Sequence, residues 1–153
     1  MQITLTNGKA VTVDDEDYHL AAQYRWHEAG GGYAAYGLRR TTIYLHRIIA
    51  GAAPGMEVDH INGDTSDNRR ANLRIATHQQ NLANQRKQQG RTSQYKGVSW
   101  DRKRSKWVAQ IKFNRQGRYL GVYTKEEDAA RAYDTAARHY FGEFARLNFS
   151  EGS

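Results

Sequence analysis

The stretch Val58-Asp59-His60-Ile61-Asn62-Gly63-Asp64 decides how the first half of the chain is interpreted. It places an Asp-His pair directly before an Asn-Gly turn. Asn72 follows, and a helix expected from about residue 78 to 88 carries Asn81. An acid, a histidine, a turn and two asparagines in this order have the layout of a small metal-dependent phosphodiesterase site.

The chemistry of phosphodiester hydrolysis suits these residue types. The reaction needs an activated water, relief of negative charge in the transition state and help for the leaving oxygen. A neutral imidazole accepts a proton near pH 7, so we expect His60 to be the general base. Asp59 and Asn81 would supply oxygen ligands and leave most of an octahedral shell open, which suits one Mg²⁺ or Mn²⁺ ion.

The backbone around the Asp-His pair must bend for this chemistry. Adjacent side chains on an extended segment point to opposite sides, so Asp59 and His60 can act together only if the chain turns. We expect Asn62-Gly63 to start that turn. His46 lies in an apolar run, which predicts a buried core histidine, with a contact to phosphate as the alternative.

Residues 58–84 resemble the ββα-metal motif of HNH endonucleases, in the subgroup found in phages and mobile introns. The resemblance implies that Asp59 is a metal ligand, His60 the general base and Asn81 the second metal ligand. It also implies that Asn72 braces the loop that bears His60. Segments before the motif are similar to the same subgroup, namely Trp26, Gly32-Tyr33 and Leu45-His46-Arg47-Ile48-Ile49.

The last position of the motif departs from the family name, because it is Asn81 and not histidine. The chain would therefore be a His-Asn-Asn variant. His78, one helical turn earlier, is the alternative ligand. Three arginines nearby are either surface charges or contacts to the DNA backbone beside the cut site: Arg69, Arg70 and Arg74.

Charge and composition favour a polyanionic partner. The 153 residues carry a net charge of +7, and residues 91–153 account for +6 of it, with 13 Lys/Arg against 7 Asp/Glu. The absence of cysteine excludes disulfides and thiolate zinc sites. No apolar run is long enough to span a membrane, and the N-terminus lacks the pattern of a signal peptide. We therefore expect a cytoplasmic protein of a bacterial or phage-infected cell, with no small-molecule cofactor.

Local patterns predict further elements. Asn7-Gly8 predicts a hairpin with a type I′ turn, and a short helix begins in the acidic run Asp14-Asp15-Glu16-Asp17. A second hairpin is expected over 33–37 and 41–45 after a glycine break. Thr77 with Gln80, and Thr124 with Glu127, match the capping-box pattern, and the second box opens a helix to about Phe141, with Gly142 after its end.

The segment from 94 onward predicts a three-stranded antiparallel sheet with one helix. Strands are expected over 95–101, 106–114 and 118–123, and the middle strand alternates apolar and polar residues. Alanines in the helix let it lie close to the sheet. We expect the free face to contact DNA in the major groove, through Lys96, Arg102, Arg104, Gln110, Lys112, Arg118 and Tyr119.

This segment resembles the plant ethylene-response-factor, or Apetala-type, DNA-binding domain. The resemblance is carried by Tyr95-Lys96-Gly97-Val98, Lys106-Trp107-Val108-Ala109, Tyr119-Leu120-Gly121, Glu127 to Asp134 and Gly142 to Phe149. Ser99 and Tyr119 replace a DNA-contacting arginine and tryptophan of the plant domains, and the loop 101–105 is one residue longer. The fold and the DNA-facing surface are therefore implied, but not the plant target sequence.

Together these patterns predict an α+β protein. Its expected parts are an HNH nuclease domain over 1–88 with its core motif at 58–86, a linker at 89–93 and a DNA-binding domain over 94–150. We expect a homing-type or phage-type endonuclease that acts on double-stranded DNA, as a monomer rather than a dimer. Two alternatives stay open: a DNA-binding regulator with a decayed nuclease core, and an RNA-binding protein that prefers single strands.

Overall fold

The computed structural model describes residues 1–38, 41–87, 90 and 92–149. The chain divides into two compact units, Met1–His78 and Gln79–Ser153. Small antiparallel sheets and a few helices alternate along it, which confirms the predicted α+β class. Within the described residues, no helix combines the length and the apolar character that a membrane crossing requires.

The first hairpin pairs β1 (Gln2–Thr4) with β2 (Ala10–Thr12), as predicted, but its turn is not type I′. A type I′ turn needs positive φ at both central residues, whereas Gly8 has φ 84° and Asn7 is not in that region. The backbone N–H of Leu5 donates to the carbonyl of Lys9 at 2.7 Å, and that of Gly8 donates to the carbonyl of Leu5 at 3.0 Å. The connection is therefore a longer loop that ends in a left-handed glycine.

A second sheet and a short helix complete the core of the first unit. After η1 (Asp15–Asp17) and α1 (Tyr18–Ala21), the sheet has the order β3-β4-β5. Its strands are His27–Glu28, Ala34–Leu38 and Thr41–Tyr44, so the predicted second hairpin is confirmed. The glycine break before it forms η2 (Gly30–Gly32).

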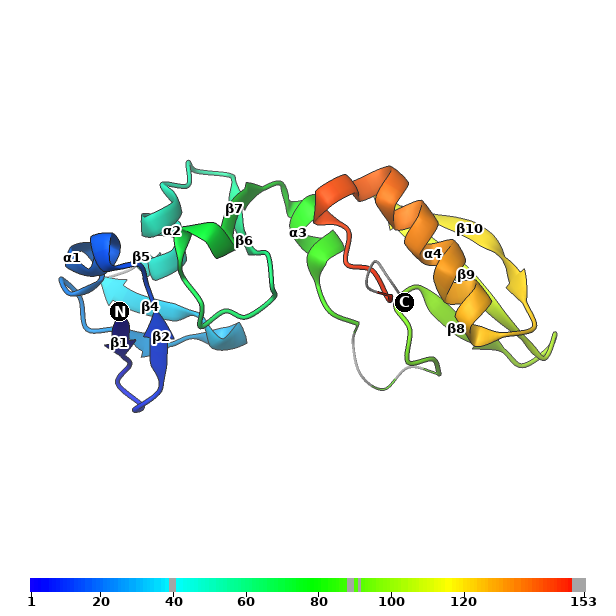
Figure 1. Cartoon of the computed structure of the whole chain (residues 1–153), viewed down its shortest axis with the longest axis horizontal. Coiled ribbons are helices and arrows are strands. Elements are labelled where there is room, and N and C mark those ends of the chain that lie inside the picture. Colours follow the sequence, from blue (N-terminus) through cyan, green and yellow to red (C-terminus); the bar gives the residue numbers. More distant parts are fainter. Residues whose placement is uncertain (39–40, 88–89, 91, 150–153) are drawn as a thin grey trace. The chain divides into compact units, whose positions relative to one another are not determined.

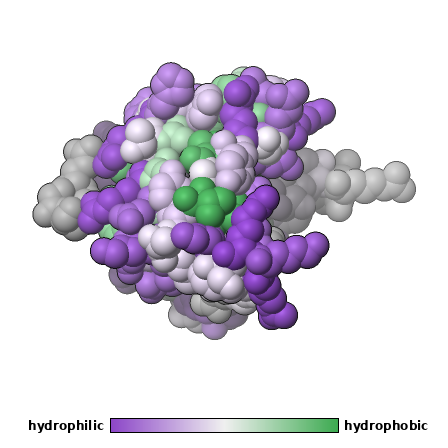
Figure 2. All heavy atoms as spheres, turned by 90° about the vertical axis from the view of Figure 1, so that its right-hand side faces the viewer, coloured by the Kyte–Doolittle hydropathy of each residue, from purple (hydrophilic) through white to green (hydrophobic). Residues whose placement is uncertain are grey.

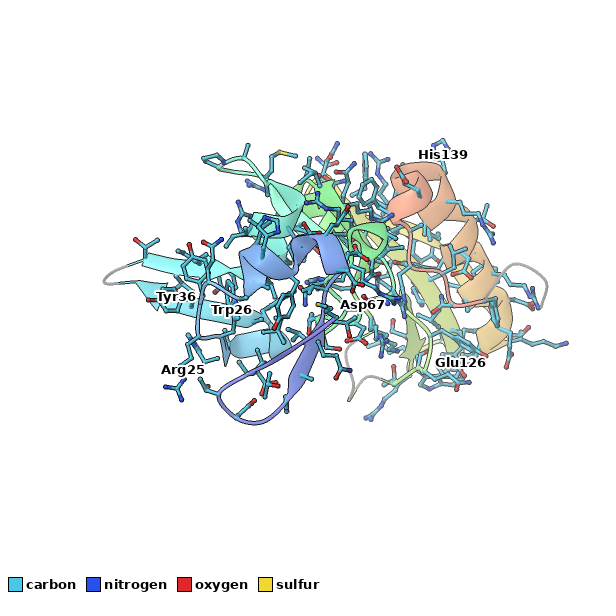
Figure 3. The ribbon with its side chains drawn as sticks, turned by 60° about the vertical axis from the view of Figure 1, so that its left-hand side comes forward. Arg25, Trp26, Tyr36, Asp67, Glu126 and His139 are labelled. Atoms are coloured by element: carbon cyan, nitrogen blue, oxygen red, sulfur yellow. The ribbon has the colours of Figure 1, made fainter. Side chains whose placement is uncertain are left out.

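Trp26 is the largest fully buried side chain of this unit (Figure 3). Its indole N–H donates to the carbonyl of Ala21 at 2.7 Å, so burial leaves no polar atom of the ring unsatisfied. The ring shares the core with Leu45 and Ile49 of α2 (Leu45–Ala50) and with Val11 of β2. This core fixes α2 beside the strand that carries the Asp-His pair.

The Asp-His pair lies on β6 (Glu57–His60), which pairs antiparallel with β7 (Leu73–Ala76). The loop between them contains η3 (Arg70–Asn72). Next in sequence comes α3 (His78–Asn84), which is shorter than the predicted helix to about residue 88. The element order is thus strand, strand, helix, and the ββα-metal arrangement of these elements stays a prediction.

The second unit contains the predicted three-stranded antiparallel sheet with one helix (Figure 1). The order β10-β9-β8 is formed by Gln116–Tyr123, Lys106–Phe113 and Val98–Asp101. The two-residue turn between β9 and β10 has positive φ at Asn114 and Arg115, so a turn of type I′ character occurs here.

The long helix α4 (Glu126–Phe141) begins differently from the prediction. Its N-cap is Lys125, which makes no side-chain capping bond, so the expected box of Thr124 and Glu127 is wrong. Three acidic residues in the first turn stabilise the start of the helix instead, because their carboxylates lie near the positive end of the helix dipole. The predicted end at Phe141 is confirmed, and Gly142 follows with φ 53°.

Two contacts fix α4 to the rest of the second unit. Gly97, with φ 77°, lies so close to Tyr133 that an added Cβ would sit 1.9 Å from Cδ2 of the ring. The buried Asp134 carboxylate accepts the backbone N–H groups of Asn148 and Phe149 at 2.8–3.0 Å. The apolar side of the sheet packs against the alanines of the helix, as predicted. The predicted domain boundaries at 88 and 94 stay a prediction.

Candidate active site and candidate nucleic-acid interface

Asp59 and His60 are neighbours at the end of β6, and both are only 4% exposed. The strand register places Asp59 opposite Arg74 and His60 opposite Leu73. His60 is the last residue of β6, and its carbonyl accepts the backbone N–H of Gly63 at 2.8 Å, so the chain turns directly after the pair.

The Asp59 carboxylate is paired with a guanidinium. Nε and Nη2 of Arg74 lie 2.8 and 2.7 Å from Oδ2 of Asp59, and the Asp59 side chain is buried while that of Arg74 is 14% exposed. A buried carboxylate needs such a partner, because removing a charge from water is costly. The guanidinium occupies Oδ2 of Asp59, so any further cation at this carboxylate would compete with Arg74.

His60 is held by the loop that follows it. Its Nε2 lies 3.3 Å from Oδ1 of Asn68. Burial is the main cause that lowers the pKa of His60, while the hydrogen bond to Asn68 and nearby carboxylates oppose the shift. A lowered pKa keeps the ring neutral near pH 7, which is the state that accepts a proton.

Asn72 joins the two ends of the loop. Its Oδ1 accepts the backbone N–H of Asn62 at 3.0 Å, and its Nδ2 donates to the carbonyl of Asp67 at 2.8 Å. Its own carbonyl accepts the backbone N–H of Ile61 at 2.9 Å. These are the bonds that a residue bracing the His60 loop would make, and the catalytic role of Asn72 stays a prediction.

The fourth predicted position, Asn81, lies in the middle of α3. From Gln79 onward this helix belongs to the second unit, so Asn81 is described with that unit. The alternative ligand His78 has its Nδ1 2.7 Å from Oε1 of Glu57, a contact that leaves its Nε2 unaffected. The choice between Asn81 and His78 stays a prediction.

His60 belongs to a cluster of four aromatic and imidazole rings, and the sequence pattern pointed to only part of this cluster. The ring centroid of His46 lies 5.3 Å from that of His60, and Tyr33 lies 4.9 Å from His46 and 5.8 Å from His60. Tyr44 completes the cluster at 5.6 Å from His46. These side chains come from segments that no local motif connects, so only the folded chain brings them together.

His46 is buried, as the apolar run around it predicted, and is 7% exposed. Its Nδ1 has no hydrogen-bond partner among the residues that the structure describes. Burial, with help from His60 and Arg47, lowers the pKa of His46 to about 3. The ring is therefore neutral at physiological pH.

Arg69 and Arg70 both bind carboxylates of their own unit. Arg69 Nε donates to Oδ1 of Asp67, labelled in Figure 3, at 2.8 Å. Arg70 donates two hydrogen bonds to the buried Asp17 carboxylate, from Nε to Oδ2 at 2.8 Å and from Nη2 to Oδ1 at 2.6 Å. Binding to phosphate would have to compete with these ion pairs, so their predicted DNA contacts receive no support from this geometry.

In the second unit, the strand register defines a free face of the sheet. Tyr119 pairs with Gln110, and Gly117 pairs with Lys112, while the intervening Ile111 is buried against α4. Gln110 and Lys112 are exposed, and Tyr119 is 64% exposed. Three of the predicted DNA-binding side chains therefore share one accessible surface.

Arg118 lies on the other side of that sheet. It pairs with Ile111, and its guanidinium carbon lies 5.3 Å from the ring centroid of Tyr140 and 5.9 Å from that of Phe113. These distances place the guanidinium in cation–π contact with both rings. Its predicted place near Gln110 and Lys112 is wrong, because residue alternation turns it toward the helix side.

The other predicted basic contacts differ in accessibility. Lys96 Nζ donates to the carbonyls of Ala83, at 2.5 Å, and Gln85, at 2.7 Å, and burial lowers its pKa to about 8. Arg104 pairs with Asp101 at 3.0 Å but is exposed, and Arg102 is exposed. Figure 2 shows a mostly hydrophilic face with only small hydrophobic areas.

A divalent ion fits the donor chemistry at Asp59. No group of three or more His, Cys, Asp or Glu side chains in the described part of the chain could hold a metal ion. One carboxylate with an amide oxygen does not need such a group, because Mg²⁺ keeps several water ligands. The donor set supports the fit, because carboxylate and amide oxygens are ligands that Mg²⁺ takes, and an ion at Asp59 would compete with Arg74 for Oδ2.

Comparison with known proteins gives two groups of relatives. A family model described as HNH endonuclease matches residues 43–83. An uncharacterized HNH endonuclease of Acanthamoeba polyphaga mimivirus is 33% identical over 150 residues, covering 92% of this chain and 75% of that protein.

The second group matches only the C-terminal part. An ethylene-responsive transcription factor of Arabidopsis thaliana is 52% identical over 59 residues, covering 37% of this chain and 32% of that protein. An AP2-like ethylene-responsive transcription factor of the same plant is 46% identical over 70 residues, covering 39% of this chain and 13% of that protein. The chain thus spans a third or less of the length of these two plant proteins.

Proposed function

This chain belongs to the HNH endonuclease family, and from that premise we propose that it is a divalent-metal-dependent enzyme that hydrolyses phosphodiester bonds of double-stranded DNA at a recognised site. The observation that carries the proposal is the buried Asp59–His60 pair at the end of β6. A loop closed by Asn72 surrounds the pair. This arrangement combines an oxygen ligand with a neutral base.

In the proposed reaction, His60 accepts a proton from the attacking water. The lowered pKa of His60 supports this role, because the ring is already neutral at physiological pH. Burial among Tyr33 and His46 restricts the ring and limits access of bulk water. Asn72 holds the loop so that the ring keeps its position.

Asp59 and Asn81 are the residues that would hold one Mg²⁺ or Mn²⁺ ion. When bound, such an ion supplies positive charge to the transition state and to the leaving oxygen. Arg74 pairs with the Asp59 carboxylate through Nε and Nη2, so it also orients that side chain.

The second unit would hold the DNA. Its sheet exposes Gln110, Lys112 and Tyr119 on one face, and glutamine and lysine suit base edges and phosphates. The similarity to plant proteins named transcription factors supports DNA as the partner. Phosphate contacts would supply most of the affinity, and the base contacts would select the site. We place the enzyme among homing-type or phage-type nucleases and expect a monomer.

Cleavage of a supercoiled plasmid tests this proposal. We expect wild-type protein with Mg²⁺ to give open-circular or linear product, and EDTA to abolish it. His60→Ala should lose cleavage by about 10²-fold or more, the contribution typical of a general base. His27→Ala is the matched control, because His27 is an exposed histidine of the same unit.

Two results would contradict the proposal. Full cleavage by His60→Ala would remove His60 as the base. DNA binding by wild-type protein without cleavage of genomic or plasmid DNA under any divalent metal would favour the regulator with a decayed nuclease core.

A further inference from the structure

Asn68 is the most buried polar side chain of the loop between β6 and β7, at 1% exposed. Its Nδ2 lies 3.4 Å from the carbonyl oxygen of Thr65 and 3.3 Å from that of Ser66. Both partners are acceptors, so they fix the nitrogen end of the amide on their side. The Oδ1 end therefore faces His60.

This orientation determines which nitrogen of His60 carries the proton. The Oδ1 of an amide has no hydrogen to donate, so the 3.3 Å contact requires an N–H at Nε2. In a neutral imidazole only one nitrogen is protonated, and the lone pair is then on Nδ1.

The position of Asn68 is set by the N-terminal hairpin. The backbone N–H of Asn68 donates to the carbonyl of Thr12 at 2.8 Å, and the N–H of Thr12 donates to the carbonyl of Ser66 at 2.8 Å. A single parallel bridge pairs Thr12 with Asp67. Strand β2 thus fixes the backbone of the loop at the residue that contacts His60.

We propose that Asn68 is a positioning residue that holds His60 as its Nε2–H tautomer, so that Nδ1 is the atom that accepts the proton from water. The proton moves from the water oxygen to Nδ1, and the O–H electron pair stays on the oxygen that attacks phosphorus. The catalytic part rests on the proposed function, whereas the assignment of the tautomer rests on the amide contacts alone.

Nitrogen-15 NMR of the full-length, metal-free protein tests the assignment without any activity. Histidine is labelled with ¹⁵N, and long-range ¹H–¹⁵N correlations above pH 8 separate protonated from unprotonated ring nitrogens. The His60 signals are identified by their loss in His60→Gln. We expect a protonated Nε2 and an unprotonated Nδ1. A protonated Nδ1 in the wild-type protein would overturn the proposal.

Two variants of Asn68 test whether its acceptor oxygen, and not the rest of its side chain, sets the tautomer of His60. Asn68→Leu and Asn68→Asp both remove the bonds to Thr65 and Ser66, but only Asp keeps an oxygen for His60. We expect Asn68→Asp to retain the Nε2–H tautomer and Asn68→Leu to give a mixture of both tautomers. An unchanged tautomer in a folded Asn68→Leu protein would overturn the proposal, and the wild-type spectrum decides it if that variant does not fold.

Plasmid cleavage distinguishes a failure of the positioning role of Asn68 from a failure of the proposed function. We expect Asn68→Leu to cleave about 10- to 100-fold more slowly than wild type, and Asn68→Asp to recover at least part of that loss. Equal rates for Asn68→Leu and wild type would overturn the positioning role. Wild-type cleavage by His60→Ala would overturn the proposed function, while the NMR result for the tautomer would still stand.

Discussion

At the scale of single residues, the site combines groups whose burial needs specific partners. Asp59 and Arg74 form a buried ion pair, and Asn68 and Asn72 fix the loop around His60. Breaking a buried pair costs more than the pair contributes, because one charge is left without its compensation. The stability of the first unit should therefore respond strongly to single changes here.

Arg74→Met tests the ion pair. We expect the free energy of unfolding to fall by about 3 kcal/mol, the scale for a broken buried pair. Urea denaturation of the full chain measures the effect. Asp59→Asn combined with Arg74→Met should recover part of the loss, because the uncompensated carboxylate is removed. Equal stability of wild type and Arg74→Met would contradict the pairing.

His46 predicts a pH dependence of stability. Its pKa is about 3 in the folded protein and near its ordinary value of 6.5 in the unfolded chain. The unfolded state thus binds more protons between these values, so this contribution to stability is present above pH 6.5 and is lost as the pH falls toward 3.

His46→Phe should lose part of that dependence, because the ring remains but no longer titrates. Thermal unfolding at pH 7.5 and pH 5 measures it, with His27→Phe as the exposed control. The drop in melting temperature should be smaller in His46→Phe than in wild type. His60, whose pKa is also lowered, leaves a residual slope. An identical slope in His46→Phe and wild type would refute the prediction.

At the scale of elements, the contact between β8 and α4 depends on one glycine. Gly97→Ala would place Cβ 1.9 Å from the Tyr133 ring at a φ of 77°. Overpacking and backbone strain act together, so we expect a loss of about 2 kcal/mol or more in the second unit. Gly117→Ala is the matched control, since nothing lies within 4 Å of its added Cβ.

Denaturant unfolding of both glycine variants, followed by tryptophan fluorescence, measures this difference. Similar stability of Gly97→Ala and Gly117→Ala would show that the close packing against Tyr133 is not required.

The sequence predicted these elements best where the pattern is long. The alternation of β9 and the alanine-rich face of α4 led to the correct sheet and helix. Local signals failed where tertiary contacts outweigh them. Asn7-Gly8 did not form a type I′ turn, and the Thr124–Glu127 box did not cap α4. Short motifs contribute about 1 kcal/mol, which packing readily overrides.

For the site, the sequence supplied the residue types but not their surroundings. The Asp59–His60 pair was visible as a motif in the sequence. The contacts of Asn68, Tyr33 and Arg74 with that pair depend on strand register and loop closure, which the sequence does not show directly. The predicted side of the sheet was wrong for Arg118 because a shift of one residue in strand register moves a side chain to the opposite face.

At the scale of the whole molecule, charge should govern binding. Residues 91–153 hold +6 of the net +7. We expect DNA affinity to fall steeply with salt. Lys112→Gln should lower the slope of log K against log salt by about one if Lys112 contacts a phosphate. Fluorescence anisotropy at several salt concentrations measures it, with Lys9→Gln as a control in the first unit. An unchanged slope would exclude a phosphate contact by Lys112.

Binding and cutting measured on the same DNA fragment, selected from cleaved genomic DNA, test most directly whether the Asp59–His60 site performs the chemistry. We expect His60→Ala to bind the fragment with wild-type affinity but not to cut it in Mg²⁺. We also expect Lys112→Gln to weaken binding and still to cut at saturating protein. Cutting by His60→Ala at the wild-type rate would contradict the assignment of the chemistry to the Asp59–His60 site.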